Sequence, residues 1–474
     1  MVPVNQVAQW LAGAHLHGDG SAWIARVHTD TRTVESGDLF VALKGERYDA
    51  NAYLLEAQQR GAVAALCHAD ADRSGITTMA CITVPDTRIA LGMLAKTWRA
   101  QFTLPVIAVT GSNGKTTVTQ MLASILAAFR PDGGSLATRG NFNNDVGVPL
   151  TLLRLRSEHQ IAVVELGMNH PGEIATLADM VQPTVALVNN AQREHLEFMH
   201  TVQAVAEENG NVIAALGPQG IAVFPQDDDY TAVWLGLAGA RRSARFALDS
   251  ATSPDVLTCL QAHWVSGAWQ VHAQGMGCVL HYRLAIAGRH NVKNSLAAAA
   301  AALSAGVPDS AVVQGLQTFE PVKGRSKAVL LSVQGREVTL VDDTYNANPD
   351  SVRAAIDVLA ELPGPRLLVL GDMGEVGHQG PAFHAEAGRY AKAKGIEHLL
   401  TLGELAQVAA SCFEGAQHYE TAEALMERLE SMLPHLHSVL VKGSRFMRME
   451  RVVQSLQSMA VGTTTLQEVP HHAA

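Results

Sequence analysis

Charged residues are scarce in this chain of 474 residues. Asp, Glu, Lys and Arg make up only 17% of it, against 47% hydrophobic residues. This balance excludes an intrinsically disordered chain and predicts a well-packed core. The charges sum to a formal net charge of -10. A general nucleic-acid binder normally carries a basic surface, so the charge argues against that class and we expect no nucleic-acid partner.

Cysteines and long apolar runs are also few. The five cysteines are odd in number and scattered, without a CxxC pair, so neither a disulfide framework nor a zinc site is expected. The alanine-rich stretch from Ser295 to Ala305 is too short for a membrane span, which takes about 20 residues. The first residues lack a basic segment followed by an apolar run, so we expect no signal peptide. These absences predict a cytoplasmic protein without a membrane span.

The length of the chain predicts about three domains. Residues 1–85 carry short strand-like segments, and Pro85 ends the last of them. Residues 86–319 alternate apolar strands with helices, although residues 219–285 favour shorter strands. Residues 320–474 repeat the alternation, and only the tail after Gly462 is expected to be loose. The pattern predicts an α/β protein with a small N-terminal α/β domain, a central parallel-sheet domain and a Rossmann-like C-terminal domain.

The clearest local motif lies between the predicted strand Val106–Thr110 and a predicted helix Lys115–Phe129. It reads Gly111-Ser112-Asn113-Gly114-Lys115-Thr116-Thr117. Glycines let backbone N–H groups turn toward phosphate oxygens, and the helix N-terminus adds a favourable dipole. Lys115 can neutralise the terminal phosphates, and the Thr116 hydroxyl can ligate Mg²⁺. The pattern predicts a phosphate-binding loop (P-loop), shortened because Val109 stands where the common form has a further glycine.

Two residues after other buried strands are candidates for the metal. Glu165 ends the strand-like segment Ile161–Leu166, where its carboxylate would project toward the phosphates. His195 follows the segment Val185–Asn189. A strand-end glutamate is more often simply solvated, and a lone histidine more often lies at the surface or in the core. Magnesium prefers oxygen ligands and keeps several waters, so one or two protein groups would suffice.

At this point the chain resembles the Mur ligase family, whose members share a TG(S/T)NGKT loop, a strand-end glutamate and a later histidine. The resemblance extends over nearly the whole chain. It implies that the loop residues bind ATP, and that Thr116, Glu165 and His195 hold Mg²⁺. It also implies catalytic roles for Lys115, Glu165 and His195.

Within the family, four segments resemble the branch that adds D-alanyl-D-alanine to UDP-N-acetylmuramoyl-tripeptide in peptidoglycan synthesis. They are GNFNNDVGVP at 140–149, DDTYNANPDS at 342–351, GDMGE at 371–375 and VKGSR at 441–445. The resemblance implies these two substrates as partners, and we expect a monomer. The motifs leave open which diamino acid the tripeptide carries.

Further roles follow from the resemblance position by position. Asn141 and Asn291 match positions that contact adenine, and Arg325 and Asp343 match positions near the ribose and phosphates. In the first 85 residues, four positions in two loops resemble a UDP-sugar site: Thr31, Arg32, Lys44 and Gly45. Hydroxyl, guanidinium and ammonium groups of this kind suit a diphosphate.

One departure concerns a lysine that many family members carry in carbamylated form to position a second Mg²⁺. No lysine occurs between Lys115 and Lys293. The matching position holds Asn209, next to Glu208. Asn209 is expected to donate a neutral oxygen near the metal, or Glu208 to supply the negative charge.

The expected reaction is ATP-dependent amide ligation through an acyl phosphate. The rival readings are another Mur-type or folylpolyglutamate-type ligase, a P-loop NTPase without ligase activity, and a paralogue that only binds nucleotide sugars. The test that separates them is whether ATP turnover needs both a carboxylate and an amine. We also expect the C-terminal domain to close onto the central one and to bring Arg325 and Asp343 to the nucleotide.

Overall fold

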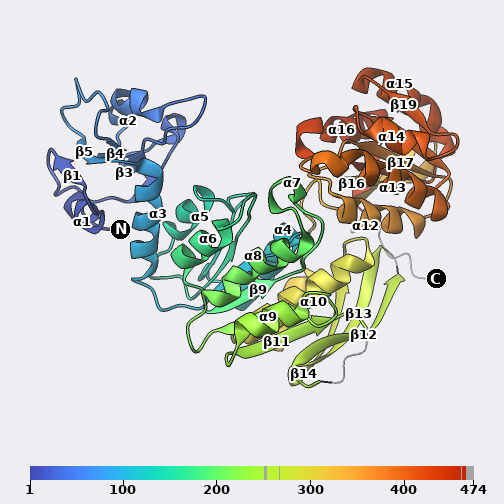
Figure 1. Cartoon of the computed structure of the whole chain (residues 1–474), viewed down its shortest axis with the longest axis horizontal. Helices are drawn as coiled ribbons and strands as arrows, with labels where there is room; N and C mark the ends of the chain where they lie inside the picture. Colours follow the sequence, from blue (N-terminus) through green and yellow to red (C-terminus); the bar gives the residue numbers. More distant parts are fainter. Residues whose placement is uncertain (250–252, 266, 461, 466–474) are drawn as a thin grey trace.

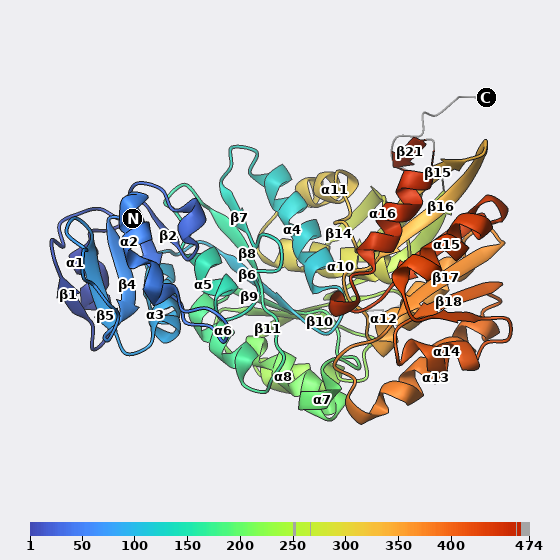
Figure 2. The same cartoon turned by 90° about the horizontal axis from the view of Figure 1, so that it is seen from above.

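The computed structural model describes residues 1–249, 253–265, 267–460 and 462–465. The chain forms three sheets of five, nine and seven strands, each flanked by helices, arranged in chain order from one end of the molecule to the other (Figure 1). Figure 2 shows the same order from above. The prediction of an α/β protein is therefore confirmed. None of the helices within these residues is both long and apolar enough to cross a membrane.

The N-terminal sheet has the strand order β1-β5-β4-β3-β2 and is parallel except at β1. Its strands are β1 His15–His17, β2 Arg26–His28, β3 Asp38–Val41, β4 Ala64–His68 and β5 Ala80–Val84. Its helices are α1 Val4–Trp10, α2 Leu54–Gln59 and α3 Thr87–Arg99. The Asp86 side chain caps the first turn of α3 by accepting from the amides of Arg88 and Ile89.

The central sheet has the order β14-β13-β12-β11-β10-β9-β6-β8-β7 and is parallel from β7 to β12. Its strands are β6 Val106–Thr110, β7 Ser135–Ala137, β8 Ile161–Glu165, β9 Val185–Val188, β10 Ile221–Pro225, β11 Arg242–Ala247, β12 Val256–Val265, β13 Ala268–Gly275 and β14 Cys278–Leu284. Its helices are α4 Lys115–Phe129, α5 Gly147–Leu152, α6 Glu173–Val181, α7 Leu196–Met199, α8 Val202–Ala214, α9 Thr231–Ala238, α10 Arg289–Ser304 and α11 Asp309–Gln317.

Helices cover both faces of this sheet, so the side chains on both faces of its strands are buried, and this explains why the strand sequences are continuously apolar. In β6, Ile107 and Val109 pack in one core with α4, α10 and α11, whereas Val106 and Ala108 belong to the opposite core. That second core continues into α3 and the N-terminal sheet, so residues on both sides of position 85 share it. The domain boundary between residues 85 and 86 therefore stays a prediction, as does the one at 319.

The C-terminal sheet has the order β19-β18-β17-β20-β16-β15-β21 and is parallel from β19 to β16. Its strands are β15 Lys327–Val333, β16 Arg336–Asp343, β17 Arg366–Gly371, β18 His398–Leu402, β19 Gln417–Tyr419, β20 Ser438–Lys442 and β21 Gly462–Thr465. Its helices are α12 Pro349–Ala360, α13 Gly380–Ala393, α14 Ala406–Ser411, α15 Ala422–Met432 and α16 Glu450–Met459.

Two details of the predicted organisation were wrong. Residues 219–285 hold the helix α9 as well as strands, and β12 alone runs for ten residues. The tail does not become loose directly after Gly462, because β21 pairs antiparallel with β15 through residues 462–465. The later part of the predicted loose tail, residues 466–474, lies outside the described residues.

Candidate active site

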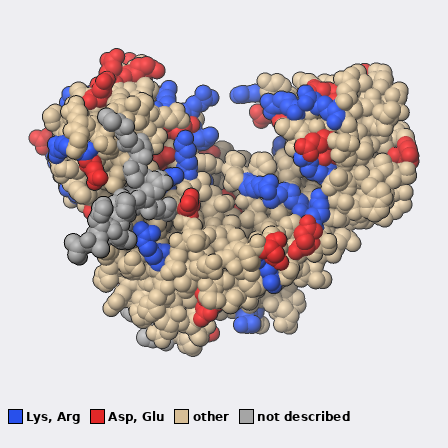
Figure 3. Space-filling model, turned by 180° about the vertical axis from the view of Figure 1, so that it is seen from behind, with Lys and Arg blue, Asp and Glu red and all other residues tan. Residues whose placement is uncertain are grey.

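A cleft of about 1670 Å³ lies between the central and C-terminal sections and reaches Arg88 at the start of α3. It opens at the carboxyl ends of parallel strands, where ligands of α/β proteins usually bind. Figure 3 shows the hollow from behind, with Lys and Arg side chains gathered along its walls. Its lining includes seven such cations: Arg88, Lys115, Arg193, Lys293, Arg325, Lys442 and Arg445. Ten Asp and Glu side chains line the cleft as well, so its charge is mixed. Phosphates and carboxylates would be attracted to the positions of the cations, such as Lys115, rather than to the cleft as a whole.

The P-loop lies on the central wall of this cleft and has its turn already formed. Gly111 has φ +127°, and a Cβ there would lie 2.9 Å from the Asn189 backbone nitrogen. Gly114 precedes α4 with φ +82° and gives that helix no side-chain cap. The first-turn N–H groups of α4 are thus left for a ligand, as phosphate binding requires.

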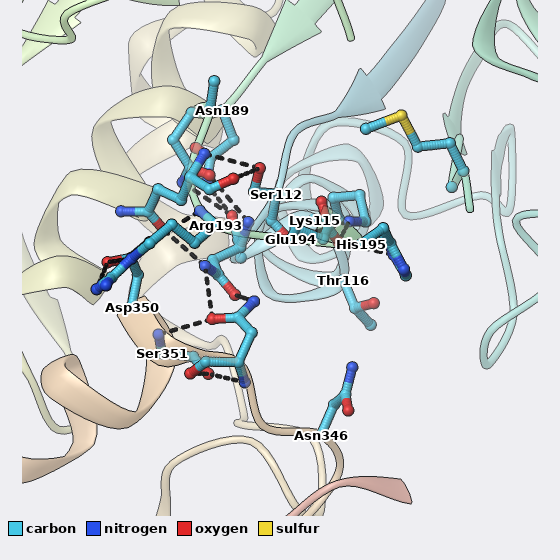
Figure 4. Close-up of a pocket in the computed structure, with 18 of the residues that line it drawn as sticks. Ser112, Lys115, Thr116, Asn189, Arg193, Glu194, His195, Asn346, Asp350 and Ser351 are labelled. Atoms are coloured by element: carbon cyan, nitrogen blue, oxygen red, sulfur yellow. Dashed lines mark hydrogen bonds and ion pairs between the residues drawn. The ribbon is translucent and has the colours of Figure 1, made fainter. Parts of the chain in front are cut away.

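Lys115 is held inside the loop. Its Nζ donates to the carbonyl oxygens of Gly111 at 2.6 Å and Ser112 at 3.0 Å. It also donates to Glu194 Oε1 at 2.7 Å. Figure 4 shows Lys115, Glu194 and His195 grouped on this wall, with Asp350 and Ser351 contributed by the C-terminal section. The ammonium group therefore stands at the phosphate position, paired with a carboxylate.

Thr116 and Glu165 meet as the sequence predicts. Thr116 Oγ1 donates to Glu165 Oε1 at 2.9 Å, and Asn143 Nδ2 donates to the same oxygen at 2.8 Å. Glu165 is only 1% exposed, and its Oε2 has no partner although the residue lines the cleft. Within the described chain, no three His, Cys, Asp or Glu side chains are grouped closely enough to hold a metal ion by themselves.

These donors fit Mg²⁺ bound together with a nucleotide. Magnesium usually takes one or two carboxylates, substrate phosphates and water rather than a cage of protein ligands. The orphaned Oε2 of Glu165 and the adjacent Thr116 hydroxyl are oxygen donors of the required kind. A buried carboxylate oxygen without a partner is costly unless a ligand satisfies it.

His195 occupies a left-handed turn with φ 49° directly before α7. Its Nδ1 lies 2.5 Å from Glu375 Oε2, across the cleft, and its Nε2 lies 3.4 Å from Glu194 Oε1. Burial alone would lower the pKa of the ring, but the carboxylates of Glu194 and Glu375 together raise it to about 9. The same contact with His195 lowers the pKa of Glu375. Metal ligation needs the neutral ring, so binding a cation at His195 requires release of this proton.

The two asparagines predicted near adenine differ in position. Asn291 lines the cleft and accepts from Asn294 Nδ2 at 2.9 Å, and Asn294 in turn accepts from Asn189 Nδ2 at 2.9 Å. Asn141 is exposed and lies outside the cleft lining, so the structure does not bring it to the site. From the same GNFNN segment, Asn143 reaches the cleft and Glu165 instead.

Arg325 and Asp343 lie on the C-terminal wall. The Arg325 guanidinium stacks over the Tyr345 ring at 3.9 Å. Asp343 accepts from Lys442 Nζ at 2.5 Å and from the Ser326 amide at 3.0 Å. Both residues line the same cleft as the P-loop, which is the arrangement expected from the sequence.

Polar contacts of three central residues, Arg193, Asn113 and His195, join the central wall to the C-terminal wall. Arg193 pairs with Asp350 at 2.6 Å and with Glu386 at 2.8 Å. Asn348 Nδ2 donates to Asn113 Oδ1 at 2.9 Å, and His195 meets Glu375 as described above. No sequence motif singles out Arg193, Glu194 or Glu386. Their only sequence signal was the charged pair before His195, which local patterns cannot connect with partners far along the chain.

The residues predicted for the UDP end lie apart from this cleft. Thr31 and Arg32 follow β2, and Lys44 and Gly45 follow β3, so both loops stand at the same edge of the N-terminal sheet. Arg32 pairs with Asp30 at 2.6 Å, and Lys44 lies 3.6 Å from Asp49. The side chains of Arg32 and Lys44 are mostly exposed and open to a ligand.

Asn209 and Glu208 were expected near the metal, and their contacts show that this expectation was wrong. Asn209 is fully buried, and its Oδ1 accepts from Thr110 Oγ1 at 2.6 Å and from the Gly111 amide at 2.9 Å. Glu208 accepts from the Ile174 amide at 2.8 Å and from Asn211 Nδ2 at 3.0 Å. Neither residue lines the cleft. Asn209 therefore braces the start of the P-loop, and neither side chain is directed at a metal.

Comparison with known proteins agrees with this geometry. Three family models match: "Mur ligase family, catalytic domain" at residues 24–99, "Mur ligase middle domain" at 109–302 and "Mur ligase, glutamate ligase domain" at 325–445. The UDP-N-acetylmuramoyl-tripeptide–D-alanyl-D-alanine ligase of Escherichia coli K12 is 40% identical over 433 residues, covering 91% of this chain and 93% of that protein.

Solved structures give the same result. A crystal structure of MurF from Acinetobacter baumannii aligns with a TM-score of 0.86 at 36% identity, covering 96% of this chain and 99% of that one. MurF ligase from Thermotoga maritima in complex with ADP aligns with a TM-score of 0.79 at 25% identity, covering 92% and 97%. By sequence and by structure, the chain belongs to the Mur ligase family.

Proposed function

We propose that this chain is an ATP-dependent, ADP-forming ligase that joins D-alanyl-D-alanine to UDP-N-acetylmuramoyl-tripeptide in peptidoglycan precursor synthesis. The observation that carries the proposal is the P-loop facing Arg325, Asp343 and Lys442 across one cleft. The E. coli relative carries this activity in its name. The Thermotoga relative was solved with ADP, which supports ATP as the nucleotide here.

The chemistry begins from an unreactive carboxylate, because oxide is too poor a leaving group for an amine to displace. Transfer of the ATP γ-phosphoryl group to the tripeptide carboxylate forms an acyl phosphate and releases ADP. The dipeptide amine then attacks the acyl carbon, an amide bond forms and phosphate leaves with the electrons of the broken C–O bond. Phosphoryl transfer of this kind needs positioning and charge neutralisation rather than a protein nucleophile.

Each part of the cleft has a matching task in this proposal. Lys115 and the amides of the P-loop receive the phosphates, and the C-terminal wall approaches the nucleotide from the other side through Arg325 and Asp343. Thr116, Glu165 and His195 are the residues that would hold Mg²⁺, which neutralises phosphate charge when bound. The contacts between the two walls hold them together around the cleft, where closure would keep water from the reactive acyl phosphate.

The remaining assignments rest on the same proposal. Thr31, Arg32, Lys44 and Gly45 would bind the UDP end, at the edge of the N-terminal sheet. Because the P-loop and the opposing wall come from one chain, we propose a monomer as the active form. We place it in the cytoplasm, where ATP and UDP-linked precursors are available.

Release of phosphate from Mg-ATP tests the proposal when it is measured with the UDP-linked tripeptide and D-alanyl-D-alanine, each alone and together. Release that needs both substrates, with a product heavier by one dipeptide, is expected. Release indifferent to both would replace the proposal by a P-loop NTPase. Dependence on a different amine would retain the mechanism but assign another ligase reaction.

A further inference from the structure

Glu194 is a buried acid on the central wall that no motif singles out. It lies in the loop between β9 and α7, is 9% exposed and lines the cleft. One of its oxygens, Oε1, accepts from Lys115 Nζ at 2.7 Å and lies 3.4 Å from His195 Nε2. The other oxygen, Oε2, is buried without a partner. The side chain therefore has an unused acceptor beside the P-loop.

The same pattern occurs at Glu165. Each of these two buried carboxylates has one oxygen held by the P-loop segment, through Lys115 or Thr116, and one oxygen without a partner. An unpaired carboxylate oxygen in a buried site calls for a proton donor or a cation. Both line a cleft suited to phosphates, where a bridging divalent cation satisfies carboxylate and phosphate together.

Arrival of a nucleotide makes this requirement stronger for Glu194. Phosphate at the P-loop competes for Lys115, which is the cation that pairs with Glu194. Released from Lys115, the carboxylate would face phosphate oxygens of like charge. The repulsion between them is large in a poorly hydrated site unless a cation lies between them. Glu194 can thus exchange Lys115 for a metal as the nucleotide enters.

We propose that Glu194 is a ligand of the divalent cation that accompanies the nucleotide, and that it keeps Lys115 in place until the nucleotide binds. This inference rests on the proposed function, because it needs a metal–nucleotide complex in the cleft. It adds a carboxylate beside His195 to the residues that would hold the cation. The Glu194 carboxylate lines the cleft next to His195. Asn209 and Glu208, the side chains expected near the metal from the sequence, do not line it.

The test is Mn²⁺ binding, followed by electron paramagnetic resonance, to the full chain with a non-hydrolysable ATP analogue. Three isosteric variants are compared with the unmodified chain: Glu194→Gln, Glu165→Gln and the control Glu197→Gln. Glu197 lies three residues further along, is exposed and does not line the cleft. Glu194→Gln should weaken Mn²⁺ binding by about tenfold or more, while Glu197→Gln should leave it unchanged.

A second measurement separates a ligand from a merely structural residue. Binding of the analogue without metal should be unchanged or tighter in Glu194→Gln, because Lys115 no longer has a competing carboxylate. Glu194→Asp keeps the charge and should retain more Mn²⁺ affinity than Glu194→Gln.

Three results would overturn the inference. One is unchanged Mn²⁺ affinity in Glu194→Gln while Glu165→Gln is weakened, which leaves the proposed function intact. Another is equal loss of Mn²⁺ and metal-free analogue binding in Glu194→Gln, which marks a structural residue. The third is absence of any Mn²⁺–nucleotide complex in the unmodified chain, which overturns the proposed function as well.

Discussion

Helices α4 and α12 face each other across the cleft, and each follows a parallel strand, β6 or β16, through a short loop. Their N-termini are finished in opposite ways. Gly114 leaves the first turn of α4 without a side-chain cap. At α12, Asn348 Oδ1 accepts from the Ser351 amide at 2.8 Å, Ser351 Oγ accepts from the Asn348 amide at 3.0 Å, and Pro349 has no N–H to satisfy.

The difference assigns different tasks to two similar pieces of structure. An uncapped helix N-terminus is available to an anion, whereas a capping box has used its donors on its own chain. The side-chain Nδ2 of Asn348 donates to Asn113 Oδ1 within the P-loop. The N-terminus of α12 thus supports the phosphate site without competing for the phosphate.

Removal of the P-loop cation should have the largest effect. We expect Lys115→Ala to lower the rate of ligation by about a thousandfold, because the charge opposite the phosphates is lost from a site that excludes water. The measurement is product formation under saturating substrates, with circular dichroism to show that the fold persists. Ligation at the unmodified rate would mean that the phosphates bind elsewhere.

The uncapped end of α4 can be obstructed directly. A Cβ at Gly114 would lie 2.6 Å from Asn294 Oδ1 and 2.7 Å from Asn189 Nδ2, at φ +82°. We expect Gly114→Ala to weaken nucleotide binding by about tenfold to a hundredfold, since strain of this kind costs roughly 1–3 kcal/mol. Isothermal titration calorimetry with ADP measures the nucleotide affinity of the variant.

Gly133→Ala is the matched control, because Gly133 has nearly the same φ, +84°, but no atom within 4 Å of an added Cβ. It separates backbone strain from crowding of the asparagine network. Equal effects of the two substitutions on nucleotide affinity would contradict the assignment of Gly114 to the phosphate site.

The P-loop and the start of α4 could be predicted from the sequence. The contacts between the central wall and the C-terminal wall could not. The spacing of Gly111, Gly114 and Lys115 after an apolar strand predicts both the loop and the start of α4. Which asparagine of the GNFNN segment reaches Glu165 could not be predicted, because its three asparagines are locally equivalent, and only the folded chain shows that Asn143 turns toward Glu165.

Contacts between distant segments could not be predicted from the sequence for a different reason. Lys115 and Glu194 are 79 positions apart, and Arg193 and Asp350 are 157 apart. Neither pair has a periodic pattern that would connect its members. Arg193 and Glu194 lie in a polar loop, and their partners Asp350 and Lys115 lie in the first turns of α12 and α4. Charged residues in loops are usually solvated, so their burial depends on how the sections pack.

Substitution of Arg193 tests whether ligation requires the ion pairs that join the two walls of the cleft. We expect Arg193→Ala to lower kcat/KM by about tenfold, because hydrogen bonds to charged groups contribute roughly 1.5–3 kcal/mol. Arg353→Ala is the control, since Arg353 also pairs with Glu386, at 3.0 Å, but within the C-terminal section. Steady-state kinetics with equal losses in both variants would show that the contact between sections is not what matters.

The same contact predicts a pH dependence. Arg193, which donates to the Glu386 carboxylate, lowers the pKa of Glu386 below its ordinary value of 4.5. A lowered folded-state pKa stabilises the contact between the two sections fully above the ordinary value, and this stabilisation is lost as the pH falls through the lowered pKa. Compactness measured by small-angle scattering should therefore persist at pH 5 and decline below about pH 4.5 in the unmodified chain. Unchanged scattering between pH 5 and 3 would contradict this role.

The smallest effect is expected at the capped helix, and it distinguishes capping from support of the P-loop. Asn348→Ala removes both the cap of α12 and the bond to Asn113, and should lower the free energy of unfolding by about 1 kcal/mol. Thr421→Ala removes only a cap, because the Thr421 side chain accepts from the Ala424 amide at the start of α15 and does not line the cleft. Urea unfolding should show similar losses for the two variants, whereas only Asn348→Ala should also weaken ADP binding, by a few-fold. If both variants bind ADP equally well, the amide of Asn348 serves its own helix alone and α12 contributes nothing to the phosphate site.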